Sequence, residues 1–369
     1  MPANQELLML LNKRIKNVTD EIKDQNADAL LIFNQANYRY LTNFTGEEAE
    51  LILTKDGDRV LLSDSRFKDQ IRHQAPGELE VVMQTMDNIK EISHQLQKLP
   101  VKKVLVEGEF ISASQFDTLV EQNPDIEFVL CNELVEKART VKDELELKAL
   151  QKAIDISMQS FKEILPLIKP GVTEKAIGAK LDYLFKINGG EGPSFETIIA
   201  SGYRGSWAHG VASDKKIQEG ELIVIDFGSF YNGYTADITR TVALGQVDSE
   251  LEKIYRIVYE AQKRGIEAAV AGHTGADIDK AARSYITEQG YGEFFGHGIG
   301  HGIGLEIHEL CTPAMPYSKE VMKDNMAITV EPGIYLPDKG GVRIEDDILI
   351  SGKDPITMSN LPKKELLVL

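Results

Sequence analysis

A chain of 369 residues is longer than one ordinary hydrophobic core can organise, so the sequence predicts two domains, or three. Its apolar fraction of 42% and charged fraction of 27% are typical of a soluble globular protein, and it has no apolar run long enough for a membrane span. The net charge of −17 disfavours phosphate backbones and anionic membranes, so we expect neither nucleic acid nor a membrane as a partner.

The amino-terminal segment and the cysteines bear on the compartment. The segment MPANQELLMLLNKRIKNVTD is polar and charged and lacks the cleavage pattern of a signal peptide. Cys131 and Cys311 lie far apart in the sequence, so a disulfide framework is not expected. A cytoplasmic location follows by default.

Residues 1–135 alternate short apolar segments with helical patterns. Strands are predicted at Ala29–Phe33, Leu51–Thr54, Val60–Ser63, Val81–Met83 and Val104–Val106. Helices are predicted at 4–25, 66–75, 87–98 and 112–122. This alternation predicts a small amino-terminal α/β domain with a largely buried sheet.

The pattern of polar and apolar residues changes near residue 135, where we place the boundary to a second domain, 136–369. A long helix is predicted from Asp143 to Ile168, ended or kinked by Pro166 and Pro170-Gly171. Further helices are predicted at 174–187, 250–271 and 275–289. They alternate with antiparallel-looking strands separated by glycine-rich turns, which predicts an α+β domain.

The segment ELIVIDFGSFYNGYTADITRTV, residues 221–242, is predicted to form a hairpin with Asn232-Gly233 as its turn. Asp226 then faces Thr239, and Asp237 lies diagonally across from Asp226 on the same face of the sheet, about 7–8 Å away. The two acids could be surface residues of the hairpin. Each interrupts an otherwise apolar strand, however, where an unpaired carboxylate is costly, and this favours metal ligands.

The segment FGHGIGHGIGLEIHE, residues 295–309, contains His297, His301 and His308. The spacing of the first two would suit a zinc-binding pair on a helix, but the glycines between them make a helix improbable. An extended glycine-rich backbone instead lets main chain and substrate approach closely. A single histidine is usually structural, whereas this cluster indicates a functional site.

Two further acids come from the last third of the chain. Glu331 ends the apolar segment ITVEPGIY directly before a Pro-Gly turn. Arg343 and Glu345 share one face of the predicted strand GVRIEDDILI, where they could form an ordinary salt bridge or belong to a ligand group. In the second case Arg343 would hold a ligand carboxylate in place.

Five side chains therefore stand out: Asp226, Asp237, His301, Glu331 and Glu345. Four carboxylates buried together without cations would repel one another and take up protons. Two divalent metals would cancel that charge, so the group predicts a dinuclear hydrolytic centre. His209, in SWAHGVAS, and Asp64, in LLSDSRF, are weaker candidates.

Together, the segments IDFG, ADITRT, GHGIGHGIGLEIHE, VEPGIY and GVRIEDD resemble the metal-dependent Xaa-Pro peptidases of the pita-bread fold. The resemblance spans the whole chain and includes YLTNFTG, LSDSRF, SFETIIASG and the carboxy-terminal PKKELLVL. These last segments are more similar to the short bacterial aminopeptidase P branch than to the prolidase branch. The resemblance implies a creatinase/prolidase-like α/β domain followed by a pita-bread catalytic domain with a curved antiparallel sheet.

The resemblance also implies roles for the site residues. Asp226 and Asp237 would hold the first metal, and Asp237 and Glu345 would bridge to a second that His301 and Glu331 complete. His209 and His308 would bind the substrate and the tetrahedral intermediate, with His297 and Arg343 in support. Glu331 would carry the proton to the departing proline nitrogen.

Two departures from the family pattern stand beside the proposed histidines. Ala208 replaces the proline that usually precedes the histidine at position 209, and Leu310-Cys311-Thr312 precedes Pro313 where the family usually has proline sooner. Neither touches a proposed ligand. We therefore expect any effect on substrate preference or rate rather than on metal binding.

The function predicted from these features is a dinuclear metallo-aminopeptidase that hydrolyses the bond between an N-terminal residue and proline. The nearest alternative is a prolidase restricted to Xaa-Pro dipeptides, and a pseudoenzyme that binds peptides is a third; a methionine aminopeptidase would not need the first domain. Oxygen-rich ligands with one imidazole suit two Mn²⁺ ions, with Co²⁺ or Zn²⁺ as alternatives. The expected partners are short proline-containing peptides and, by the resemblance, a second copy in a homodimer.

Overall fold

The computed structural model describes residues 2–84, 87–309 and 316–369. Contacts divide the chain into two compact units, Met1–Arg139 and Thr140–Leu369. No helix in the described ranges is both long and apolar enough to cross a membrane.

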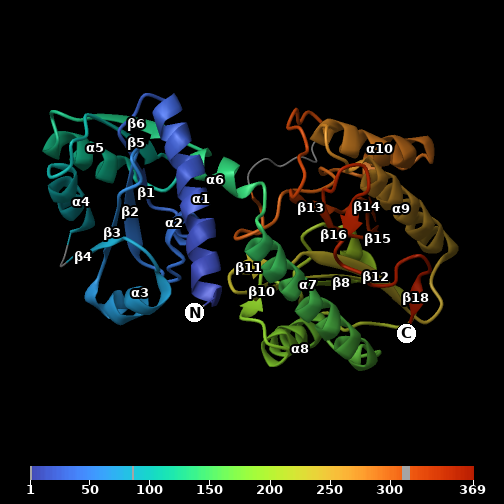
Figure 1. Ribbon diagram of the computed structural model, residues 1–369. Helices are drawn as coiled ribbons and strands as arrows, with labels where there is room; N and C mark the ends of the chain where they lie inside the picture. The colour runs from blue at the N-terminus through green and yellow to red at the C-terminus, as the bar shows by residue number, and fades with distance from the viewer. Residues whose placement is uncertain (1, 85–86, 310–315) are drawn as a thin grey trace. The chain divides into compact units, whose positions relative to one another are not determined.

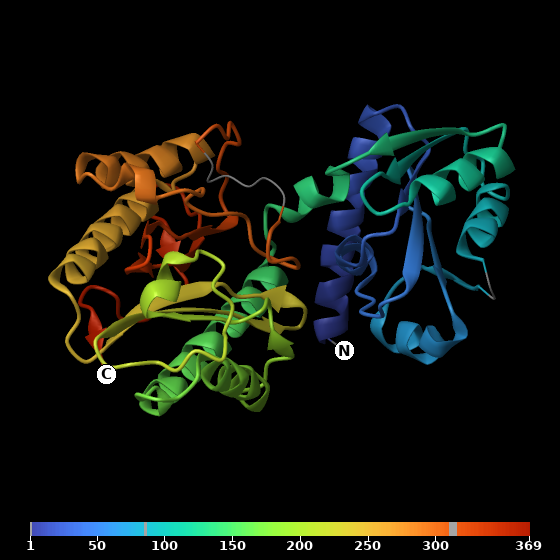
Figure 2. The same cartoon turned by 180° about the vertical axis from the view of Figure 1, so that it is seen from behind.

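The amino-terminal unit is an α/β sandwich around a mixed sheet of order β4-β3-β2-β1-β5-β6. Its strands are β1 (Ala29–Ile32), β2 (Ala49–Thr54), β3 (Arg59–Ser63), β4 (Glu80–Met83), β5 (Lys103–Glu107) and β6 (Glu127–Cys131). Its helices are α1 (Pro2–Asp24), α2 (Gln35–Thr42), η1 (Ser65–Phe67), α3 (Lys68–Gln74), α4 (Asn88–Leu96), α5 (Ala113–Gln122) and α6 (Leu134–Arg139). Figures 1 and 2 show α1 on one side of this sheet and α4 and α5 on the other.

Burial on both faces explains why these strands read as continuous apolar runs. Leu31, Ile52 and Val104 pack in one cluster with Ile92 of α4 and Leu119 of α5. The alternate strand residues, such as Leu30 and Leu105, are also fully buried. The predicted strands and helices of this unit are present, with ends moved by a few residues, whereas α2, β6 and α6 were not predicted.

The carboxy-terminal unit places sheets between two pairs of helices. The helices are α7 (Glu144–Ile164), η2 (Leu165–Leu167), α8 (Glu174–Ile187), η3 (Gly202–Ser206), α9 (Ser249–Ala268), α10 (Gly275–Glu288) and η4 (Gly292–Phe294). Both views show the strands between α7 and α8 on one side and α9 and α10 on the other (Figures 1 and 2). Asp143 starts α7 by accepting hydrogen bonds from the backbone of Leu145 and Glu146, and the helix ends before Pro166, inside the predicted range.

Antiparallel pairing dominates the strands of this unit. In chain order they are β7 (Gly192–Pro193), β8 (Ile198–Ser201), β9 (Glu221–Phe227), β10 (Ser229–Tyr231), β11 (Tyr234–Thr235), β12 (Ile238–Leu244), β13 (Ala327–Val330), β14 (Gly333–Leu336), β15 (Gly340–Arg343), β16 (Asp346–Leu349), β17 (Ile356–Thr357) and β18 (Leu367–Val368). Their sheets have the orders β18-β12-β9-β8, β11-β10-β7, β13-β16-β17 and β14-β15. Of these pairs only β12 and β18 run parallel among the described residues.

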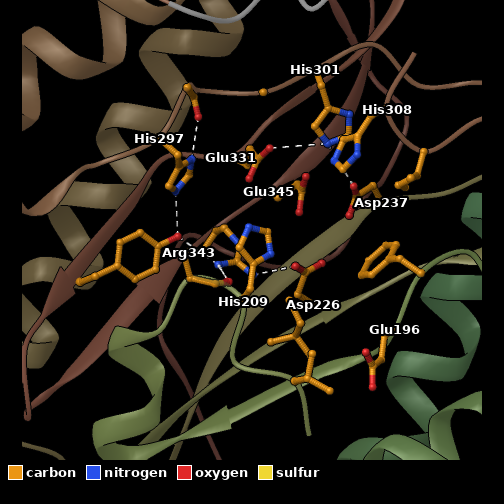
Figure 3. A pocket seen from close by; sticks show the side chains of 18 residues that line it. Glu196, His209, Asp226, Asp237, His297, His301, His308, Glu331, Arg343 and Glu345 are labelled. Atoms are coloured by element: carbon orange, nitrogen blue, oxygen red, sulfur yellow. Dashed lines mark hydrogen bonds and ion pairs between the residues drawn. The ribbon is translucent and has the colours of Figure 1, made fainter. Parts of the chain in front are cut away.

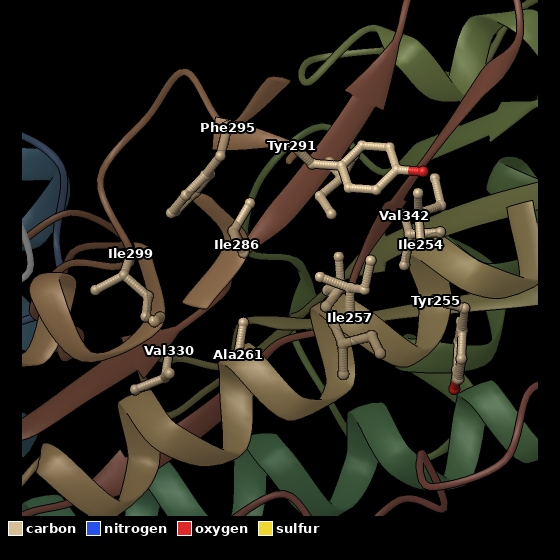
Figure 4. Close-up of a cluster of buried hydrophobic side chains, with 14 of the residues drawn as sticks. Ile254, Tyr255, Ile257, Ala261, Ile286, Tyr291, Phe295, Ile299, Val330 and Val342 are labelled. Carbon is tan, nitrogen blue, oxygen red and sulfur yellow. The ribbon is translucent and has the colours of Figure 1, made fainter. Parts of the chain in front are cut away.

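The main core of this unit lies beneath α9 and α10 (Figure 4). Ile254 and Ala261 of α9 pack in one cluster with Ile286 of α10, Val330 of β13 and Val342 of β15. Packing in this core therefore holds β13 and β15 in place. It thereby positions Glu331 and Glu345, the acidic residues that follow these strands.

Candidate active site

The hairpin carrying the first two acids has the predicted register. Asn232 and Gly233 have φ of 47° and 71°, as a two-residue type I′ turn requires. Tyr231 is opposite Tyr234, and Asp226 of β9 is opposite Thr239 of β12. Asp237 comes immediately before β12, and both acids are buried.

The glycine-rich segment between Gly296 and Gly304 runs directly along β13. The backbone N–H of Thr329 donates to the carbonyl of His301 at 2.8 Å, and that of Glu331 donates to Ile299 at 2.6 Å. A Cβ atom at Gly300 would lie 2.0 Å from the Thr329 carbonyl oxygen, so only glycine permits this approach. The predicted close backbone contact is thus present, and it places His301 beside Glu331.

Glu345 interrupts what the sequence predicts as one continuous strand. The structure differs: β15 ends at Arg343 and β16 begins at Asp346. In the gap the Glu345 N–H donates to the carbonyl of Thr239 at 3.1 Å, and the Thr239 hydroxyl donates to Glu345 Oε2 at 2.6 Å. This local departure from the ladder fixes Glu345 against β12.

All five predicted ligands meet at one pocket (Figure 3). His301 Nε2 lies 3.3 Å from Asp237 Oδ2 and 3.6 Å from Glu331 Oε1. Single ligand atoms of Asp237, His301 and Glu345 all lie within 4.8 Å of one another. Asp226 lines the same pocket.

Crowding perturbs the acids of this group. Burial, and then the charges of Asp226 and Glu331, raise the pKa of Asp237 well above its ordinary value. Burial, and then Asp237 and Glu331, likewise raise the pKa of Glu345. Without cations these carboxyls would hold their protons more tightly than ordinary carboxyls do, which is the expected behaviour of an anionic ligand set that lacks its metals.

The donor set fits divalent cations on three structural grounds. Asp226 Oδ1 is buried and has no hydrogen-bond partner among the described residues. The His301 Nδ1 is 3.0 Å from the carbonyl oxygen of Gly302, so this nitrogen carries the proton and Nε2 presents its lone pair to the carboxylates. Four carboxylates and one imidazole together suit two oxygen-preferring divalent metals.

A hydrogen-bonded chain supports the acids from one side. Arg343 Nη2 donates to Asp226 Oδ2 at 2.6 Å, and its Nη1 donates to Tyr335 at 2.9 Å and to the Ala208 carbonyl at 3.0 Å. The Tyr335 hydroxyl lies 2.9 Å from Nε2 of His297, whose Nδ1 lies 2.7 Å from the carbonyl oxygen of Gly298. Both nitrogens of His297 are thus engaged within the protein. Burial lowers its pKa, so the ring is neutral near pH 7.

His209 and His308 also line the pocket (Figure 3). The rings of His308 and His301 make an edge contact with centroids 4.4 Å apart. Partial burial, and then the ring of His301, lower the pKa of His308, so it is a neutral hydrogen-bond donor near pH 7. Both imidazoles border the space in front of the candidate ligands.

The structure also adds residues that the sequence reasoning missed. Thr239 contacts both Glu345 and Arg343, and Tyr335 links Arg343 to His297. The hairpin register already placed Thr239 opposite Asp226, which was the available signal. Asp64 lies in the other unit, where it caps η1 and pairs with Arg66. The Leu310-Cys311-Thr312 departure lies outside the described residues.

The comparisons with known proteins agree with this geometry. Residues 148–352 match Metallopeptidase family M24, and residues 14–141 match the Creatinase/Prolidase N-terminal domain. The chain belongs to family M24. This M24 protein is similar to the Xaa-Pro dipeptidase of Pyrococcus horikoshii, with 36% identity over 93% of this chain and 95% of the relative.

Two solved structures are similar to this M24 protein over nearly its whole length. The Xaa-Pro dipeptidase from Bacillus anthracis has 40% identity and a TM-score of 0.93, covering 97% of this chain and 100% of that one. The X-Pro aminopeptidase from Thermotoga maritima has 39% identity and a TM-score of 0.86, covering 93% and 98%. The predicted family and the predicted α/β plus pita-bread architecture are confirmed, and the M24 protein is a metallopeptidase.

Proposed function

We propose that this protein is a dinuclear metal-dependent Xaa-Pro peptidase that acts chiefly on Xaa-Pro dipeptides. The observation that carries the proposal is the convergence of Asp226, Asp237, His301, Glu331 and Glu345 on one pocket. The preference for dipeptides is supported by the Xaa-Pro dipeptidases of Pyrococcus horikoshii and Bacillus anthracis. It reverses the order favoured by the sequence motifs, which put the aminopeptidase first.

When bound, two divalent cations would supply a water of lowered pKa and neutralise charge on the scissile carbonyl oxygen. Asp226, Asp237 and Glu345 would hold them, together with His301 and Glu331. We propose Mn²⁺ for this oxygen-rich set, with Co²⁺ or Zn²⁺ as alternatives.

The chain's own side chains would then orient the peptide and move its proton. His209 and His308 face the pocket as donors for the carbonyl oxygen, where negative charge develops. Glu331, the least buried of the five candidate ligands, would pass a proton to the departing proline nitrogen. Arg343 would hold Asp226 in position by a direct hydrogen bond. His297 would support Arg343 through the hydroxyl group of Tyr335, which contacts both residues.

The bond before proline suits such a site. The nitrogen of this bond carries no hydrogen, so a peptidase that needs a hydrogen bond from the N–H of the scissile bond cannot cleave it. Nothing in the proposed arrangement requires a hydrogen bond from this nitrogen. Short proline-containing peptides are therefore the proposed substrates.

A second candidate is an Xaa-Pro aminopeptidase that accepts longer peptides. The likeness to the Thermotoga maritima X-Pro aminopeptidase, at 39% identity, favours it. The pseudoenzyme alternative is disfavoured because all five candidate ligands are competent side chains that meet in one place. The homodimer implied by the family resemblance and the cytoplasmic location stay predictions.

Matched substrates distinguish these candidates. The Mn²⁺-loaded protein should cleave Met-Pro with at least a tenfold higher kcat/KM than Met-Pro-Ala. A tenfold difference corresponds to roughly one hydrogen bond that the dipeptide makes and the tripeptide does not. Met-Gly should resist cleavage as the control peptide. A higher kcat/KM for Met-Pro-Ala would support the aminopeptidase, and no cleavage of any Xaa-Pro peptide would contradict both candidates.

A further inference from the structure

Glu196 is the pocket carboxylate that the proposed chemistry leaves without a role. Among the described residues lining the pocket, five carry a carboxylate, and four of these belong to the candidate ligand group. Glu196 is exposed, and no hydrogen bond or ion pair connects it to another described residue. Its negative charge therefore faces the pocket uncompensated.

The position of Glu196 follows from the strand that comes after it. Ile198 of β8 is directly opposite Asp226 of β9. In extended backbone, residues two apart point to the same side, and Glu196 and Ile198 both line the pocket. Glu196 precedes β8, so it lies past the end of this pairing and not among the ligand positions. Figure 3 shows it on the far side of Asp226 from His297.

The pocket that holds both the ligand group and Glu196 also has an apolar wall. This wall consists of Phe195, Ile198, Val211 and Ile307. An apolar wall with an anionic end is complementary to a side chain that has an aliphatic stem and a cationic tip. Lysine has that form, with an ammonium group on a four-carbon stem, and arginine has a longer equivalent.

We propose that Glu196 is a specificity-determining residue that favours lysine or arginine as the residue before proline. This inference rests on the proposed function and names the substrate class of the same site. The peptide's scissile carbonyl lies at the ligand group, and the cationic side chain extends along the apolar wall to Glu196. The protein's net charge of −17 adds a long-range attraction for the same peptides.

The peptide's own α-ammonium is the other cation that could meet Glu196. That group is attached next to the scissile carbonyl, so it lies close to Asp226 and Asp237 when the carbonyl is at the ligand group. Glu196, on the far side of Asp226 from His297, is better matched by the end of a long side chain (Figure 3). The two sources give different results, because every substrate has an α-ammonium whereas only some have a side-chain cation.

The test compares Lys-Pro with norleucine-Pro, whose side chains have similar stems and differ in charge. In Glu196→Gln the ratio of kcat/KM for Lys-Pro over norleucine-Pro should fall about two- to fivefold, as expected for an exposed ion pair. The decrease should come from the Lys-Pro value and should vanish in about 1 M salt. Glu288→Gln, which makes the same change in net charge at an exposed site on α10, should leave the ratio unchanged.

Each other result would overturn the inference. An equal decrease of kcat/KM for both peptides in Glu196→Gln would assign Glu196 to the α-ammonium, and unchanged kcat/KM values for both peptides would remove it from recognition. A ratio that falls equally in Glu288→Gln would mean that net charge alone is responsible. If the wild-type protein cleaves norleucine-Pro but the ratio does not respond, only this inference fails. If it cleaves neither peptide, the proposed function fails as well.

Discussion

Thr239 joins two parts of the candidate site through one buried hydroxyl group. Its Oγ1 donates to Glu345 Oε2 at 2.6 Å and accepts from Arg343 Nε at 3.1 Å. A residue that orients a ligand carboxylate in this way normally affects metal affinity strongly, although it never touches the metal.

Thr239→Val should therefore weaken metal binding about tenfold while preserving side-chain shape. The reason is that Glu345 would lose the donor that fixes its carboxylate. Competition with a fluorescent chelator measures the affinity. Thr241→Val is the matched control, because Thr241 is equally buried on the same strand but bonds to the Arg343 backbone. Equal effects of both changes would show that the loss is general.

His308 gives a second prediction at this scale. His308→Ala should lower kcat about 100- to 1000-fold, because a donor to the developing oxyanion is lost. Metal content, measured on the purified variant, should stay at the wild-type value. His273→Ala, at an exposed turn bonded to Ala268, should leave kcat unchanged. Loss of metal from the His308 variant would instead make His308 a ligand.

Among the structural elements, the hairpin and the glycine-rich segment were the most predictable parts of the site. Asn232-Gly233 determines a two-residue turn, and the turn determines the register that sets Asp226 against Thr239. The break between β15 and β16 could not be predicted, since GVRIEDDILI has the alternation of one strand. The hydrogen bond from Glu345 to Thr239 that breaks it joins residues far apart in the sequence.

Three short elements of the first unit, α2, β6 and α6, were not predicted. α2 has eight residues and begins at Asn34, whose side chain accepts from Ala36 N, so it depends on its cap and its packing rather than on a long periodic pattern. β6 is an edge strand whose apolar run Phe128–Cys131 is a strand signal, so the sequence contained evidence for it that the prediction did not use.

Glu107, at the end of β5, ties that strand to the start of α2. Its Oε2 accepts from the backbone N–H groups of Phe33 and Asn34 at 2.8 and 2.7 Å, and its Oε1 accepts from Asn37 at 2.6 Å. Burial nevertheless raises the pKa of Glu107 from its ordinary 4.5 to about 7. The folded state thus binds more protons than the unfolded state between these two values.

The free energy of unfolding of this unit should consequently fall as pH rises. The Glu107 contribution is fully present below about pH 4.5 and is lost by about pH 7, a change of about 3 kcal/mol at most. Glu107→Gln should flatten this dependence, measured as hydrogen-exchange protection of β1 and β5 at several pH values. Glu127→Gln, on the exposed edge strand, should keep the wild-type slope. The same slope in Glu107→Gln would refute the assignment.

At the scale of the whole molecule, the sequence predicted which residues would form the site better than how the chain supports them. The acids and histidines interrupt apolar or glycine-rich segments. Burying a polar side chain there costs free energy unless it has a partner, so such a residue can be recognised in the sequence as a candidate site residue. Tyr335, Thr239 and Glu196 cannot be recognised in this way, because their proposed roles depend on neighbouring residues that only the fold brings close. The proposed dipeptide preference also departs from the motifs, which favoured the aminopeptidase, and it rests on the named dipeptidase relatives.

Anomalous diffraction from crystals soaked in Mn²⁺ can locate the paired cations that we propose for the pocket formed by these five distant side chains. We expect two anomalous peaks among Asp226, Asp237, His301, Glu331 and Glu345. Both peaks should disappear in crystals of Asp237→Ala. Peaks elsewhere in the molecule, with none at these side chains, would contradict the proposal.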